Sequence, residues 1–159
     1  MSTTTIQTHQ FHFTSADGMR IACNRWYSWG RPNGVFQIAH GIAEHIGRYT
    51  GLIERLVESG LVVFGNDHRG HGLSALSPRQ FGDFGPGGFD LLVENIGKLS
   101  RIAGEESPQL PLILLGHSLG SFDGSEESFH SGLKPDRPRP TISLGRVSCE
   151  ACAGLKGPT

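Results

Sequence analysis

The chain has 159 residues, a formal net charge of -1 and a pI near 6.7. This length suits one domain with a real core, and the balanced charge argues against a nucleic acid or an anionic membrane surface as partner. No run of about 18 apolar residues is present, so no membrane span is expected. The N-terminus lacks the basic and apolar regions of a signal peptide, and three cysteines make no disulfide framework. The sequence therefore predicts a cytoplasmic protein.

The first predicted elements form a hairpin. Residues 9–15 alternate around Phe11 and Phe13, as in a half-buried strand. The dipeptide Asp17–Gly18 is typical of a hairpin turn, and residues 19–27 follow it as the expected returning strand.

Strands and helices alternate after this hairpin. Apolar residues at helical spacing predict helices over 49–59, with Gly60 as the C-terminal cap, and over 89–102, whereas 74–88 is expected to be a loop. This order favours an α/β fold with a mainly parallel sheet and flanking helices. Three short apolar runs predict strands that are buried on both faces: 35–39, 61–64 and 112–115.

The end of the chain differs in composition from the rest. Gly, Pro and Ser make up 14 of the 38 residues in 122–159, and no periodicity lasts there for more than a few residues. Such a composition buries too little apolar surface to offset the entropy of ordering. We therefore divide the chain into a folded part, 1–121, and a foreign-looking tail, 122–159. The tail is expected to be disordered and to contain at most short helical pieces.

The segment GHSLG, from Gly116 to Gly120, matches the pattern G-x-S-x-G directly after the third apolar run. In such a nucleophile elbow, small flanking residues let two backbone segments approach, and the serine stands clear of the sheet in a strained conformation. The N–H of Leu119 would then point at a developing oxyanion. The pattern predicts that Ser118 is a nucleophile. The alternative is a glycine-rich turn without catalysis.

Two more motifs follow the first two apolar runs: HGIAEHIGRY at 40–49 and NDHRGHGLS at 66–74. With GHSLG, their order resembles the α/β-hydrolase superfamily, in particular its monoacylglycerol lipase and lysophospholipase group, the serine aminopeptidase-like hydrolases. That group carries HG-x-x-EH-x-x-RY, D-x-RGHG-x-S and GHS-x-G in this order. The resemblance covers residues 9–121, roughly the N-terminal half of a typical member. It implies hydrolysis of a small acyl ester, a monoacylglycerol or a lysophospholipid, without a cofactor or a metal ion.

The resemblance also implies residue roles. Ser118 matches the nucleophile that forms the acyl-enzyme. The backbone N–H groups of Ile42 and Leu119 match the two oxyanion donors. The polar side chains of the first two motifs match architectural positions that brace loops near the site, here His40, Glu44, His45, Arg48, Asp67, Arg69 and His71.

A serine hydrolase also needs a histidine that accepts the serine proton and a carboxylate that orients this histidine. In this superfamily the acid and then the histidine follow the serine, after further strands. The candidates are Asp123, His130 and Asp136, but none lies in a family-like motif, so no triad acid or base is assigned. The rival hypothesis is a catalytically inactive truncated or frameshifted fragment. Its strand at 112–115 would form an open apolar edge and promote self-association.

The sequence contains no convincing motif for a metal ion or a phosphate group. His40, Glu44 and His45 do not have the spacing of a metal-binding helix motif. Cys149 and Cys152 lack the second ligand pair that structural zinc needs. The segment GHSLGS lacks the lysine of a phosphate-binding loop. No metal or phosphate site is predicted.

Overall fold

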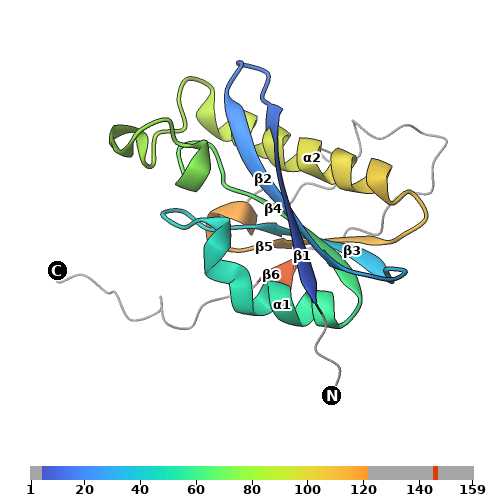
Figure 1. Ribbon diagram of the computed structural model, residues 1–159. Coiled ribbons are helices and arrows are strands. Elements are labelled where there is room, and N and C mark those ends of the chain that lie inside the picture. Colours follow the sequence, from blue (N-terminus) through green and yellow to red (C-terminus); the bar gives the residue numbers. More distant parts are fainter. Residues whose placement is uncertain (1–4, 122–144, 147–159) are drawn as a thin grey trace.

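The computed structural model describes residues 5–121 and 145–146 (Figure 1). An antiparallel hairpin opens the fold: β1 (Ile6–Thr14) pairs with β2 (Arg20–Ser28) along their full lengths. The turn at Asp17–Gly18 allows this pairing because Gly18 adopts φ 86°, which L side chains rarely do. The predicted hairpin is confirmed, although β1 starts before the expected range 9–15 and both strands stop one residue short of the expected turn ends, at Thr14 and Arg20.

Six strands form one mixed sheet in the order β1-β2-β4-β3-β5-β6. β2 runs antiparallel to both of its neighbours, and the pairs β4–β3, β3–β5 and β5–β6 are parallel. The predicted α/β fold with a mainly parallel sheet is therefore confirmed. The strands that follow the hairpin are β3 (Gly34–Ala39), β4 (Leu61–Asn66), β5 (Leu112–Gly116) and β6 (Gly145–Arg146).

Two helices connect the parallel strands. α1 (Thr50–Glu58) joins β3 to β4 after a short 3-10 turn at Ile46–Tyr49, and α2 (Gly88–Glu106) precedes β5. Gly60 ends α1 as expected: its φ is 89°, and its N–H donates to the carbonyl of Val57 at 3.0 Å. Within residues 5–121, neither helix combines the length and apolar character that a bilayer crossing requires.

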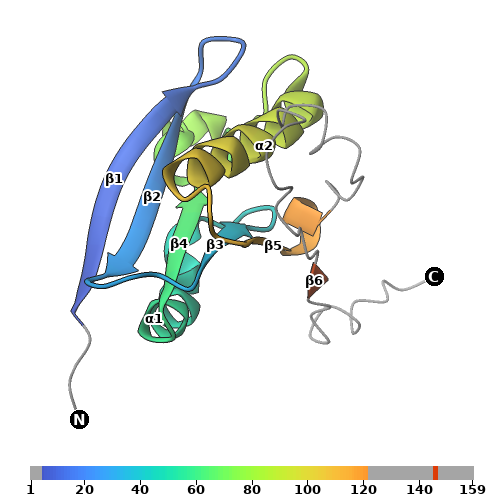
Figure 2. The same ribbon diagram turned by 90° about the vertical axis from the view of Figure 1, so that its right-hand side faces the viewer.

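The helices cover opposite faces of the sheet (Figure 2). Side chains alternate along each strand, so Ile38 of β3 packs with α1 while Val35 packs with α2. Full burial of one such side chain contributes about 1.5–3 kcal/mol. The core on the α1 side contains Ile38, Ile46, Ile53, Val57 and Val63, and the α2 side contains Val35, Phe64, Leu92, Ile96, Leu99, Ala103, Leu112 and Leu114.

The connection between β4 and α2 contains two further 3-10 turns. They lie at Gly72–Ser74 and Pro78–Gln80, so the expected loop at 74–88 is interrupted by the second. The physical reason is local, because Pro78 fixes the φ of the first residue in its turn and needs no hydrogen-bond partner for its nitrogen.

The sequence predicts an open strand edge at 112–115, and this prediction is wrong at the C-terminal end of the strand. β6 pairs with β5 there, with Leu115 opposite Gly145 and Gly116 opposite Arg146. The expectation that the tail has only helical pieces is therefore also wrong at these two residues. Backbone ladder bonds do not depend on side-chain type, so the N–H and C=O groups of an edge strand pair even with a glycine-containing segment. In the described residues, Leu112, Ile113 and Leu114 pair with β3 alone.

Candidate active site

Three loops meet where the parallel strands end. The loop after β3 carries His40 to His45, the loop after β4 carries Asp67 to Ser74, and β5 leads into His117 and Ser118. Carboxyl ends of neighbouring parallel strands lie at one edge of a sheet, which is where ligands bind in α/β proteins. The three sequence motifs therefore come together at this edge.

Ser118 sits in a sharp turn directly after β5. It is exposed and has φ 50°, one of two non-glycine residues with positive φ in the described chain. Such a conformation is costly for an L residue and is kept only where the surroundings hold it. Here the N–H of His117 donates to the carbonyl of Ala39 at 3.0 Å, and the N–H of Gly120 donates to the carbonyl of His117 at 3.0 Å. These bonds fasten both sides of the serine.

The two glycines of the turn are required by close backbone contact. A Cβ atom on Gly116 would lie 2.6 Å from the carbonyl carbon of Gly120, and one on Gly120 would lie 2.8 Å from the carbonyl carbon of Ala39. Real Cβ atoms do not approach backbone this closely. The G-x-S-x-G spacing therefore has the structural cause expected from the sequence.

We expect Gly116→Ala to destabilise the protein by about 1–3 kcal/mol, because the backbone of Gly120 must move to admit the methyl group. Gly104→Ala is the matched control. Gly104 lies in α2 with no heavy atom within 4 Å of an added Cβ, so this change should instead stabilise by about 0.5–1 kcal/mol. Urea denaturation at sub-micromolar concentration measures both changes. Equal effects of the two substitutions would contradict this explanation of the turn.

The loop after β3 lies against Ser118. A Cβ atom on Gly41 would be 3.4 Å from the Cβ of Ser118 and 2.9 Å from Nδ1 of His117, so only a glycine brings the backbone this close. Ala43 has φ 58°, and its N–H donates to Nε2 of His71 at 3.2 Å. Ile42 lies between these two anchored residues, with a largely exposed side chain. The sequence-predicted pair Ile42 and Ser118 is thus brought to one place.

Leu119, the second expected oxyanion residue, is fixed through its side chain. It packs against the cluster of Ala39, Leu92, Ile96 and Leu114 beneath α2. This contact holds the backbone that follows Ser118.

A cluster of buried histidines supports the loop from below. Nε2 of His40 accepts a hydrogen bond from the N–H of His68 at 2.9 Å, and Nε2 of His68 lies 3.0 Å from the carbonyl of His40. The two rings are 4.0 Å apart between centroids. Burial lowers the pKa of His40 to about 4 and holds the pKa of His68 well below its usual range. Both rings are therefore neutral at pH 7. The backbone N–H of His68 is the donor in the 2.9 Å contact, and Nε2 of His68 is the donor in the 3.0 Å contact.

Asp67 and Arg69 are likewise structural. The carboxylate of Asp67 accepts the N–H groups of Ile46 and Leu73, each at 2.8 Å, and so ties the loops after β3 and β4 together. The buried guanidinium of Arg69 pairs with Asp17 in the first hairpin turn. These contacts agree with the bracing role that the sequence resemblance implies.

Glu44 connects the loop to the serine turn. Its Oε2 accepts the N–H of Gly41 at 2.9 Å and the hydroxyl of Tyr49 at 2.7 Å, and it lies 3.1 Å from Nδ1 of His117. Burial alone would raise the pKa of Glu44, but the hydrogen bonds from Tyr49, Gly41 and His117 outweigh it and lower this pKa to about 2. Glu44 is therefore a carboxylate throughout the physiological range. His45 and Arg48 are exposed, and their backbones form the turn before α1.

Residues 5–121 do not supply a proton acceptor for Ser118. The neighbouring His117 directs Nδ1 to Glu44, and within this range the side-chain oxygen of Ser118 has no hydrogen bond to a histidine. The same range contains no group of three His, Cys, Asp or Glu side chains that could hold a metal ion. The residues weighed as triad acid or base lie outside the described residues: Asp123, His130 and Asp136.

Sequence reasoning missed three contributors to the site: Tyr49, His68 and His117. Tyr49 and His68 stand inside the quoted motifs, but no spacing signals that they contact Glu44 and His40. His117 is part of the GHS-x-G motif, but nothing in the motif indicates that it contacts Glu44.

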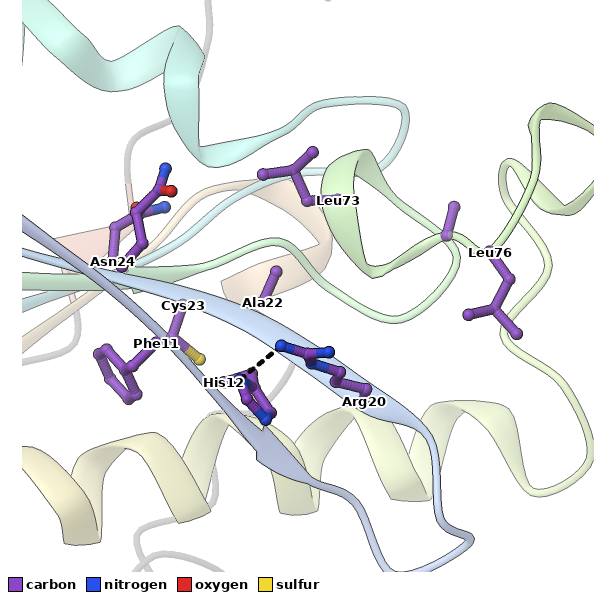
Figure 3. A pocket seen from close by; sticks show the side chains of 10 residues that line it. Phe11, His12, Arg20, Ala22, Cys23, Asn24, Leu73 and Leu76 are labelled. Carbon is purple, nitrogen blue, oxygen red and sulfur yellow. Dashed lines mark hydrogen bonds between the residues drawn. The ribbon is translucent and has the colours of Figure 1, made fainter.

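A separate hollow of about 490 Å³ lies between the first hairpin and the turn after β4 (Figure 3). Ser118 does not line it. Cys23 lies in its wall, and burial raises the pKa of this thiol to about 12, so the sulfur stays protonated and unreactive. At the rim, Arg20 and His12 are joined by a 2.8 Å hydrogen bond. The exposed side chains of Leu73 and Leu76 line the other side.

The sheet order and the serine turn at the end of β5 define the α/β-hydrolase fold. A thermostable carboxyl esterase from Bacillus coagulans, solved with glycerol, is similar, with a TM-score of 0.70 and 31% identity over 80% of this chain and 41% of the esterase. The family model for serine aminopeptidases, S33, matches residues 30–124. The chain belongs to this hydrolase family.

Two curated relatives are named for the lipase that acts on monoacylglycerols. The monoacylglycerol lipase of Mycolicibacterium smegmatis is 40% identical over 68% of this chain and 37% of its own length. Human monoglyceride lipase is 36% identical over 69% of this chain and 34% of its own length. The chain thus spans little more than a third of the length of these two relatives, and its resemblance to the monoacylglycerol lipase group is confirmed over that part.

Proposed function

We propose that this chain carries the nucleophile and oxyanion pocket of a serine hydrolase that cleaves carboxylic esters. One observation carries the proposal. Ser118 is exposed at φ 50° on the elbow after β5, with the Gly41–Ile42 backbone held against it. An accessible serine beside fastened backbone N–H groups is the arrangement that acyl transfer needs.

The proposed chemistry proceeds in two steps. Ser118 Oγ attacks the ester carbonyl, gives its proton to a base and displaces the alcohol, which takes up that proton; an acyl-enzyme remains. Water then attacks the acyl carbon, returns a proton to Oγ through the same base and releases the carboxylic acid. The N–H groups of Ile42 and Leu119 stabilise the oxyanion in both steps. The base and its orienting acid must come from outside residues 5–121, and no cofactor enters the scheme.

The proposed substrate is a monoacylglycerol, because the relatives at 40% and 36% identity are named for that activity. A lysophospholipid is the second candidate from the sequence resemblance. The test is release of fatty acid from each substrate by the chain completed with the part of a relative that follows the match, with Ser118→Ala as control. Equal rates with and without the serine hydroxyl would exclude this function.

The alternative proposal is a catalytically inactive fragment. One observation favours it: Ser118 has no histidine partner in residues 5–121. The division of the chain into a family part, 1–121, and a tail, 122–159, is part of this alternative proposal. The family match supports this division because it ends at residue 124. Translation of the coding DNA in the other two frames after codon 121 tests a frameshift. The cytoplasmic location stays a prediction.

We also expect the chain to self-associate. Leu112 to Leu114 have a ladder partner on one side alone in the described residues, and Ile113 and Leu115 are only partly buried. An apolar strand with free N–H and C=O groups invites pairing with another copy. Light scattering of the purified chain at micromolar concentration should show particles larger than a monomer. A monodisperse monomer with one cooperative thermal transition would refute this expectation.

A further inference from the structure

The Glu44 carboxylate joins two segments that are far apart in sequence. One of its bonds goes to Gly41, the residue immediately before Ile42, and another goes to His117, the residue immediately before Ser118. One oxygen atom thus spans the gap between the proposed oxyanion donor and the proposed nucleophile. The Glu44 side chain is only 16% exposed, so water competes weakly for these bonds.

Gly41 lies close to both Glu44 and the serine turn. A Cβ atom added to Gly41 would be 3.1 Å from Oε2 of Glu44 and 3.4 Å from the Cβ of Ser118, so the space between the two segments is about one methyl group wide. The hydrogen bond from the Gly41 N–H to Glu44 opposes movement of the loop away from the serine turn.

We propose that Glu44 is a positioning residue, which fixes the distance between the Ile42 N–H and Ser118 by bridging Gly41 and His117. This inference rests on the proposed function, but it concerns backbone geometry that can be measured without turnover. Loss of one oxyanion donor typically slows catalysis by about 10²–10³-fold, and a misplacement of about 1 Å is comparably costly. Loss of a bridge that keeps the donor in place is therefore expected to slow catalysis.

A purely structural role for Glu44 makes a different prediction. Glu44 also accepts the hydroxyl of Tyr49, at the start of α1, so it could act only by anchoring that helix. Tyr49→Phe removes this anchor and leaves the bridge between Gly41 and His117 intact. Glu54→Gln is the matched control for charge, because Glu54 is an exposed carboxylate on α1.

The experiment follows the full chain in five forms: unchanged, Glu44→Gln, Glu44→Ala, Tyr49→Phe and Glu54→Gln. Amide hydrogen exchange is resolved to single residues by mass spectrometry at sub-micromolar concentration, which limits self-association. We expect exchange of the Gly41 amide to accelerate about tenfold or more in both Glu44 variants, because a charge-assisted hydrogen bond is weakened or lost. Exchange of Val63 in the core strand β4 should stay unchanged.

Reaction of Ser118 with a fluorophosphonate probe gives the second readout. Any slow Ser118-dependent labelling should fall about tenfold or more in Glu44→Gln and stay unchanged in Glu54→Gln. Absence of all Ser118-dependent labelling is the result expected where no base activates the serine, and the exchange data alone then decide the role of Glu44. Unchanged Gly41 exchange in both Glu44 variants, or the same change in Tyr49→Phe, would overturn the proposal. So would global unfolding of both Glu44 variants, which would assign Glu44 to fold stability.

Discussion

The chain by itself is expected to release fatty acid from a monoacylglycerol no faster than its Ser118→Ala variant. Joined to the part of the Mycolicibacterium smegmatis lipase that follows the match, it is expected to become a Ser118-dependent esterase. The reason is chemical: a serine hydroxyl is a weak nucleophile until a neighbouring base takes its proton. In residues 5–121 the adjacent His117 instead bonds to Glu44.

The expected gain is on the order of 10⁴-fold or more, the range lost when a member of a catalytic triad is removed. Fatty-acid release by the joined protein, with and without Ser118→Ala, measures it. Leu115→Ala in the joined protein is a control that alters β5 without touching the serine. A joined protein that folds yet hydrolyses no ester would remove the support for Ser118 as a nucleophile.

Stability is expected to fall steeply between about pH 6.5 and pH 4. The folded-state pKa of His40 is lowered to about 4 from an ordinary value of 6.5, because burial disfavours its charged form. Between these values the unfolded chain binds a proton that the folded chain does not, so acid favours unfolding. The difference corresponds to roughly 3 kcal/mol of lost stability, with His68 acting in the same direction. The carboxylate of Glu44 adds a further loss below about pH 4.5.

Urea denaturation across this pH range tests the effect. His40→Asn should be less stable at pH 7, because the shorter amide does not reach both partners of the ring nitrogens, the carbonyl of Gly41 and the N–H of His68. It should show a shallower fall toward pH 4, because an amide does not titrate. The control is His9→Asn, which changes an exposed histidine in β1 and should keep the original slope. A His40→Asn variant with the unchanged pH dependence would show that His40 is not the responsible group.

The sheet could be predicted from sequence because each strand carries its own signal. The apolar runs at 35–39, 61–64 and 112–115 became β3, β4 and β5, and the Asp17–Gly18 turn joined two strands as expected. Gly60 ended its helix for the reason that its position suggested. The pairing of Gly145–Arg146 with β5 could not be predicted, since ladder bonds use the backbone and leave no side-chain pattern.

The candidate site was predictable where chemistry constrains residue type. Gly116 and Gly120 are glycines because backbone atoms occupy the space of a side chain, and Ser118 occupies the strained position between them. The connection of Glu44 to His117 had no such signal, because it joins residues 73 positions apart through side chains. Asp17 shows the same limit: its turn was predicted, but its pairing with the buried Arg69 depends on the tertiary fold.

We propose, as the central claim, that Ser118 is positioned for attack and that residues 5–121 hold no base that activates it. The most direct measurement is stoichiometric labelling of the intact 159-residue chain by a fluorophosphonate probe at micromolar concentration, with intact mass as the readout. We predict negligible labelling, the same as for Ser118→Ala. Rapid labelling of one site per chain, abolished by Ser118→Ala and equally by His130→Ala, would contradict this prediction and show that the chain provides its own base.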